Sequence, residues 1–222
     1  MNKKLIIWDF DGVIADTEKL WLQVRLEKLN KEFNLNWDME TTNKYIGGMA
    51  DKNKREVLNG LGIITDDLFW EETFKTDINK IHSGICLTEN IEDIFKLKEY
   101  KQCIATGGIY SKTELKIKAV GIEKYFNREN VFTVDMVEKG KPEPDLFLLA
   151  AKTMGYKPEN CIVIEDSIVG LIAAIKANMT PIAFVGSEIC QNDTYRNKIR
   201  NLDVKYVFDN MKDVKKAISI LS

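Results

Sequence analysis

The stretch IIWDFDGVIADTE, residues 6–18, places three aspartates directly after a short hydrophobic run. The apolar residues at its start predict a buried β-strand. Asp9, Asp11 and Asp16 follow that strand, although an unpaired buried carboxylate costs several kcal/mol unless a positive group neutralises it. We therefore expect a cation, either a side chain or a metal ion, next to these carboxylates.

Short apolar runs of the same kind recur along the chain and alternate with helical stretches. The predicted strands cover residues 4–9, 102–106, 131–135, 161–166, 181–186 and 204–209. Their apolar residues are continuous and do not alternate with polar ones, which is typical of a parallel sheet covered on both faces. The sequence therefore predicts an α/β fold with a Rossmann-like parallel sheet. Between the strands, the capping-box pattern SKTE at residues 111–114 predicts a helix that ends near Gly121, and Gly155 predicts another helix end.

The segment between Thr17 and about Ile85 has no strand pattern. It contains helical stretches at residues 18–33, 51–62 and 66–82. We predict an α/β core domain made of residues 1–15 and 86–222, with an all-helical cap domain, residues 16–85, inserted over a site at the strand ends. Aromatic residues at roughly helical spacings are expected to form the core of the cap, with a binding stripe as the alternative: Trp21, Phe33, Trp37, Phe69, Trp70 and Phe74.

Composition excludes several classes of function. The chain has 222 residues, 45% hydrophobic and 30% charged, with a net charge of −2, so it has no basic field for a nucleic acid. The first apolar run stops at Asp9, far short of a membrane span.

The cysteines, Cys86, Cys103, Cys161 and Cys190, have no CxxC spacing and are expected to be buried free thiols. We expect a cytoplasmic monomer that binds neither nucleic acid nor membranes.

Polar residues collect where the predicted strands end, which is where ligands bind to open parallel sheets. Four carboxylates against one lysine give this set a formal charge of −3, and all-oxygen ligands favour Mg²⁺. A carboxylate there could accept a phosphoryl group, and a second could protonate the leaving alcohol. The lysine, a threonine hydroxyl and backbone N–H groups near Gly12 could hold a phosphate. The candidate residues are Asp9, Asp11, Thr106, Lys141, Glu165 and Asp166.

Four segments in this order resemble the motifs of the haloacid dehalogenase (HAD) superfamily. They are DFDGVIADTE, the strand end at Thr106, Lys141 in KGKPEPDLF, and IEDSIVG. The resemblance spans about residues 4–186 and is strongest to phosphatases and β-phosphoglucomutase-like enzymes with a small helical cap.

The resemblance implies a role for each matching residue. Asp9 would be the nucleophile and a Mg²⁺ ligand. Asp11 would be the general acid and then the general base, with its backbone carbonyl on the metal. Phosphoryl oxygens would be held by Thr106 and by Lys141, which would also restrain Asp9. The metal site would be completed by Glu165 and Asp166.

Each motif also has a structural interpretation when it is taken alone. The Asp-Gly pair could be a simple turn, Lys141 a solvated loop lysine, and Glu165 with Asp166 an N-cap pair for the next helix. His82 is expected to be a surface or hinge residue, with substrate contact as the alternative.

Substrate contacts are expected from both predicted domains. Gly107 and Gly108 follow Thr106 and could offer backbone N–H groups, while Gly48 lies in a tight cap loop. Lys52 and Arg55 beyond that loop are either an exposed helix face or a clamp on the distal group of the substrate.

These patterns predict a Mg²⁺-dependent phosphatase that hydrolyses a small phosphorylated metabolite, such as a sugar phosphate, through an aspartyl-phosphate. A β-phosphoglucomutase-like phosphomutase is the alternative, but Gly107, Gly108 and Ile109 replace its polar phosphate grip, and Ile46 and Ala50 occupy its expected basic positions. A non-catalytic phospho-acceptor protein is a further alternative, against which Asp11 and the helical cap argue. Closure of the cap is expected to expel water from the site.

Overall fold

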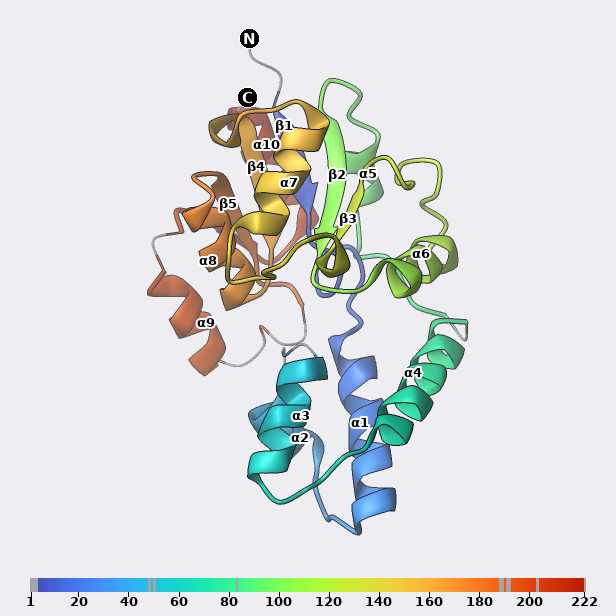
Figure 1. Cartoon of the computed structure of the whole chain (residues 1–222). Coiled ribbons are helices and arrows are strands. Elements are labelled where there is room, and N and C mark those ends of the chain that lie inside the picture. Colours follow the sequence, from blue (N-terminus) through green and yellow to red (C-terminus); the bar gives the residue numbers. More distant parts are fainter. Residues whose placement is uncertain are drawn as a thin grey trace. The chain divides into compact units, whose positions relative to one another are not determined.

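The structure is a computed structural model that describes residues 4–47, 49, 51–82, 84–187, 190, 193–202 and 204–221, without the side chains of residues 18, 51 and 52. The chain forms two compact units (Figure 1). The core unit is Met1–Asp16 with Cys86–Ser222, and the cap unit is Thr17–Ile85. No helix in the described ranges is long and apolar enough to cross a membrane.

The core unit contains a six-stranded, fully parallel sheet of order β3-β2-β1-β4-β5-β6. All six predicted strands are confirmed, with ends that agree or differ by at most two residues. At β3 the strand stops two residues early, before a 3₁₀ turn, Val134–Met136. The strands are β1 (Leu5–Trp8), β2 (Lys101–Thr106), β3 (Val131–Thr133), β4 (Cys161–Glu165), β5 (Thr180–Phe184) and β6 (Tyr206–Phe208).

Helices cover the sheet because its strands carry apolar residues on both faces. In Figure 1, α7 (Asp145–Met154) and α8 (Ile168–Lys176) lie in front of the strands. Their buried side chains pack with Leu5, Ile7 and Cys103 into one apolar cluster. Trp8 points to the opposite face, since side chains alternate along a strand, and meets Phe95 edge-on at 5.3 Å between ring centroids. The other core helices are α5 (Glu92–Phe95), α6 (Tyr110–Ala119), α9 (Asp193–Arg200) and α10 (Met211–Ile220), with a 3₁₀ helix at Pro158–Asn160.

The strand order places a switch point beside β1. The chain runs from β1 to β2 and β3 on one side, then returns to β4, β5 and β6 on the other. In such sheets the crevice beyond the carboxyl ends of the strands at the switch point binds the ligand. The ends of β1 and β4 are therefore where a functional site is expected.

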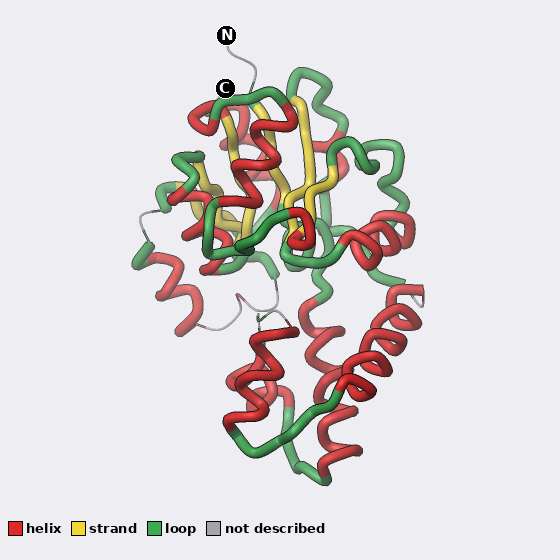
Figure 2. Tube along the Cα trace, in the orientation of Figure 1, coloured by secondary structure: helices red, strands yellow, loops and turns green. Residues whose placement is uncertain are grey.

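The cap unit consists of helices and loops in its described residues (Figure 2). Phe69 is buried in its apolar cluster, with Phe33, Trp37 and Trp70 packed against it, so these four aromatics are confirmed as cap core. Arg25 and Asp77 form a buried bidentate ion pair between the first and last helices. The helices are α1 (Glu18–Phe33), α2 (Met39–Ile46), α3 (Asp51–Gly60) and α4 (Asp67–His82).

Two local predictions are wrong. The helix α6 begins one residue before Ser111, and its N-cap residue, Ile109, has extended backbone and no side-chain cap bond. The SKTE pattern therefore lies inside the helix, because the turn after β2 begins the helix earlier. Cys86 is exposed, whereas Cys103, Cys161 and Cys190 are buried free thiols as expected. Gly155 ends α7 with a left-handed φ of 79°, as predicted.

Candidate active site

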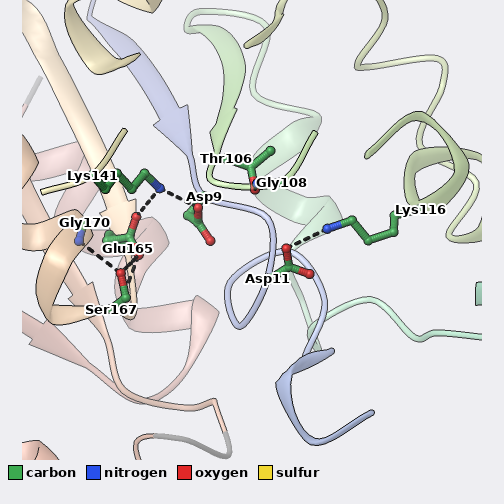
Figure 3. Close-up of polar contacts among 9 residues, drawn as sticks. All are labelled: Asp9, Asp11, Thr106, Gly108, Lys116, Lys141, Glu165, Ser167 and Gly170. Carbon is green, nitrogen blue, oxygen red and sulfur yellow. Dashed lines mark hydrogen bonds and ion pairs between the residues drawn. The ribbon is translucent and has the colours of Figure 1, made fainter. Parts of the chain in front are cut away.

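Asp9 lies one residue beyond β1, and its carboxylate is buried against a lysine from another loop. Lys141 Nζ donates to Asp9 Oδ1 at 2.6 Å and to Glu165 Oε2 at 2.7 Å (Figure 3). Burial and the Glu165 carboxylate raise the pKa of Asp9 from 3.8 to about 7, against the lowering effect of Lys141. Burial by itself lowers the pKa of Lys141, but the charges of Asp9 and Glu165 raise it overall. The lysine therefore orients Asp9 without fully neutralising the acidic cluster.

The turn after β1 is held tightly against β4. The N–H of Asp9 donates to the carbonyl of Ile164, and that of Gly12 donates to the carbonyl of Ala15. Gly12 has a φ of +84°, and a Cβ there would lie 1.9 Å from Asp166 Oδ2. Glycine is required at this position both by its left-handed backbone and by the close approach of Asp166.

Glu165 ends β4, and Asp166 follows it. Glu165 Oε1 accepts from the backbone N–H and the hydroxyl of Ser167, at 3.0 and 2.7 Å. The Ser167 hydroxyl also accepts from the N–H of Gly170 and so caps α8. Asp166 Oδ2 accepts from the hydroxyl of Ser187 at 2.8 Å. The N-cap residue is thus Ser167, and the alternative in which Glu165 and Asp166 cap the helix is wrong.

The donor set at this end of the sheet fits a hard divalent cation. Each of Asp9, Glu165 and Asp166 offers one carboxylate oxygen within 4.8 Å of the other two, and all three residues are buried. Carboxylate oxygens accept several partners, so the bonds from Lys141 and Ser167 leave coordination capacity. Compact, all-oxygen sites of this kind suit Mg²⁺.

Thr106 ends β2 and is almost completely buried. Its hydroxyl accepts from the N–H of Gly108 at 3.3 Å, so this N–H is directed at Thr106 in the structure. A Cβ on Gly107 would meet no atom within 4 Å. The hydroxyl of Thr106 remains able to donate to a ligand oxygen beside it.

The site contains a second lysine, Lys116, which is the partner of Asp11. Sequence reasoning did not identify this lysine. Lys116 Nζ, from α6, donates to Asp11 Oδ2 at 2.6 Å (Figure 3). The prediction that counted one lysine at the site therefore needs correction: with Lys116 included, the four carboxylates and two ammonium groups carry a formal net charge of −2. One divalent cation would neutralise this charge.

The structure describes only some of the cap residues that were predicted as substrate contacts. Gly48 and Ala50 lie outside the described residues, as does the side chain of Lys52. Arg55 forms an ion pair with Asp67 at 2.7 Å inside the cap unit, where both side chains are exposed, which agrees with the exposed helix face. His82 is the exposed last residue of α4.

Ser167 and Ser187 were also absent from the sequence-based set. Ser167 could have been found from its position directly before the apolar run of α8, which is typical of an N-cap serine. Ser187 lies 21 residues beyond its partner Asp166, and no local pattern marks that contact.

The parallel sheet, the switch point and the acidic centre beside it define an α/β enzyme with a site suited to a cation and an anionic substrate. The chain belongs to the haloacid dehalogenase-like hydrolase family, whose sequence model matches residues 6–184. This membership confirms the resemblance inferred from the four motifs.

Individual relatives agree with the family assignment. The chain is 32% identical to "Putative phosphatase YhcW" of Bacillus subtilis over 79% of this chain and 80% of that protein. It is 29% identical to the phosphorylated carbohydrates phosphatase of Thermotoga maritima over 78% and 81% of the two chains. A haloacid dehalogenase-like protein of unknown function from Agrobacterium tumefaciens shares the fold, with a TM-score of 0.84, 23% identity and 99% coverage of both chains.

Proposed function

We propose that this protein is a Mg²⁺-dependent phosphatase that hydrolyses a small phosphorylated metabolite through an aspartyl-phosphate on Asp9. The observation that carries the proposal is the buried contact of Asp9 with Lys141 at the switch point, beside the carboxylates of Glu165 and Asp166. Among chemistries that use a carboxylate nucleophile, phosphoryl transfer also needs cations around the transferred group, and this site is built to supply them.

Asp9, Glu165 and Asp166 would hold the metal ion, together with the backbone carbonyl of Asp11. When bound, the ion would neutralise charge on the carboxylates and on the phosphoryl oxygens. Lys141 keeps the Asp9 carboxylate oriented, and Thr106 can donate its hydroxyl to a phosphoryl oxygen.

In the first step, a carboxylate oxygen of Asp9 attacks phosphorus, and the bond from phosphorus to the ester oxygen breaks. Asp11 gives its proton to that oxygen, which leaves as an alcohol. In the second step, Asp11 removes a proton from water, the water oxygen attacks phosphorus, and the bond to Asp9 breaks. Inorganic phosphate is released, and both aspartates return to their starting states.

A phosphorylated carbohydrate is the proposed substrate class. The Thermotoga maritima relative is named for that activity and covers 78% of this chain. The overall acidity of the chain, with a net charge of −2, also favours a small anion held by local groups over a polyanion.

The test is release of inorganic phosphate from a panel of sugar phosphates, including fructose 1-phosphate, glucose 1-phosphate and 6-phosphogluconate. Wild-type protein is measured with Mg²⁺ and with EDTA, and Asp9→Asn serves as the catalytic control. We expect repeated turnover that requires both Mg²⁺ and Asp9. Release that persists in EDTA would contradict the metal requirement, and release by Asp9→Asn at the wild-type rate would remove Asp9 as the nucleophile.

The same panel separates the alternatives. A phosphomutase would isomerise a sugar phosphate without net phosphate release, and a phospho-acceptor protein would release at most one phosphate per chain. Either result would overturn hydrolysis as the function while leaving the family unchanged.

A further inference from the structure

We propose that Lys116 is a positioning residue that holds the Asp11 carboxylate for proton transfer to the leaving group. This inference rests on the proposed phosphatase function and adds a residue to its machinery. Lys116 lies ten positions beyond Thr106, on α6, outside every motif that the sequence matched.

The contact between Lys116 and Asp11 is short and largely shielded from water. Nζ lies 2.6 Å from Asp11 Oδ2, and the lysine side chain is 3% exposed against 26% for the aspartate. The ammonium also lies 4.4 Å from the centroid of the Phe10 ring, which is a cation–π distance. Two separate interactions therefore fix the lysine head group next to the turn after β1.

A lysine is an unexpected residue at this position of α6. The helix buries Thr113, Lys116 and Ile117, which share one face at the i, i+3 and i+4 spacing. An apolar side chain would be expected there, because burying an ammonium carries a desolvation cost. The ion pair with Asp11 offsets that cost, and the Asp11 side chain is the group that gains a fixed position.

Lys116 contacts the Asp11 carboxylate from one defined side. In Figure 3 it approaches Asp11 from the side away from Lys141 and Glu165. The cluster of carboxylate oxygens that could hold a metal contains Asp9, Glu165 and Asp166 among the described residues, without the Asp11 side chain. The side chain that Lys116 contacts is therefore not one of these three candidate ligands, and it is available for the proton.

The ammonium lies beside the expected phosphoryl position. A Cβ at Gly108 would be 3.7 Å from Thr106 Oγ1 and 3.8 Å from Lys116 Nζ. The hydroxyl that would bind the phosphoryl group and the lysine that holds Asp11 therefore both lie next to Gly108. An acid held at this place is close to where the ester oxygen must leave.

A leaving-group comparison tests this role. Full-length Lys116→Met is assayed with Mg²⁺ on fructose 1-phosphate, whose alkoxide needs a proton to leave, and on p-nitrophenyl phosphate, whose phenolate does not. We expect kcat to fall about 10- to 100-fold on fructose 1-phosphate and about threefold or less on p-nitrophenyl phosphate, with KM little changed. Lys118→Met, an exposed position on the same helix, is the matched control and should leave both rates unchanged.

Further variants distinguish the loss of positioning from a folding defect. Lys116→Gln keeps a hydrogen-bond donor without the charge and should show the same split between substrates, while Lys116→Arg should recover part of the lost rate. Thermal unfolding and circular dichroism verify that each variant is folded.

The outcomes separate the inference from the function on which it rests. Equal losses on both substrates, or no loss on either, in the folded variants would overturn the positioning role while the phosphatase function stands. A wild-type protein that releases no phosphate from either substrate would overturn both.

Discussion

Asp9 is the proposed nucleophile, and the burial of its charge lowers the stability of the folded protein. Its folded pKa of about 7 is above the ordinary value of 3.8, so the folded protein loses stability as the pH rises through this range and Asp9 ionises. Asp9→Asn removes that charge and keeps the shape of the side chain. We expect phosphate release to be abolished and Tm at pH 8 in EDTA to equal or exceed that of wild type.

Both effects of Asp9→Asn can be measured on one preparation, by a phosphate assay and by calorimetry. A lower Tm for the variant would mean that the ion pair with Lys141 outweighs the burial of the charge.

Gly12 allows a second prediction at the residue scale. In Gly12→Ala the new methyl group would displace the Asp166 carboxylate from its bond with Ser187. We expect the Mg²⁺ concentration for half-maximal activity to rise about 10- to 100-fold, because outer contacts orient metal ligands. Magnesium titrations of phosphate release measure this shift.

Gly121→Ala is the matched control for Gly12→Ala. Gly121 also has a positive φ, +69°, but a Cβ there would meet no atom within 4 Å. Both variants should lose about 1–2 kcal/mol of stability from backbone strain. An equal rise in the Mg²⁺ requirement of the control would trace the effect to lost stability and away from Asp166.

At the scale of single elements, the start of α8 links a helix cap to the acidic centre. The Ser167 hydroxyl accepts from the N–H of Gly170 and donates to Glu165 Oε1. Ser167→Ala should cost about 1 kcal/mol of stability through the lost cap. It should also raise the Mg²⁺ requirement, since Glu165 loses one of the groups that orient it.

The N-cap of α10 provides the comparison for Ser167. Asn210 accepts from the N–H of Asp213 at 2.9 Å and has no role in the proposed site. Asn210→Ala should have a similar stability cost, measured by urea unfolding, with unchanged Mg²⁺ dependence. If the two variants behave alike in activity, the hydroxyl of Ser167 acts only as a cap.

At the scale of the whole molecule, each of the two compact units has its own apolar cluster. A substitution that destabilises one unit should therefore increase local unfolding mainly in that unit. Asp77 is the test position, because Asp77→Ala leaves the Arg25 charge buried without its carboxylate. Loss of one partner of a buried pair costs about 3–5 kcal/mol. We expect faster hydrogen exchange in α1 and α4, with β1 and β4 unchanged.

Hydrogen exchange with mass spectrometry resolves these segments in a single experiment. Glu27→Ala, which removes an exposed hydrogen bond with Gln23 on the same helix, is the control and should leave exchange nearly unchanged. Uniformly faster exchange in both units for Asp77→Ala would show that they unfold together.

The six strands and most candidate residues could be predicted from the sequence because their patterns are local. A continuous apolar run identifies a buried parallel strand, and a carboxylate directly after it marks the carboxyl end of that strand. Asp9, Thr106 and Glu165 each lie at or next to such an end. Helix starts were less certain, as the SKTE pattern shows, because a turn can begin a helix before a good capping sequence.

The sequence by itself therefore determined the α/β class, the strand positions and the group of Asp9, Asp11, Lys141 and Glu165. Only the tertiary structure decided that Lys116 faces Asp11, 105 positions away. The physical reason is that helical periodicity indicates which residues share a face, whereas the rotation of the helix against the sheet decides what that face meets. A buried lysine and its carboxylate become partners only when α6 packs beside the turn that follows β1.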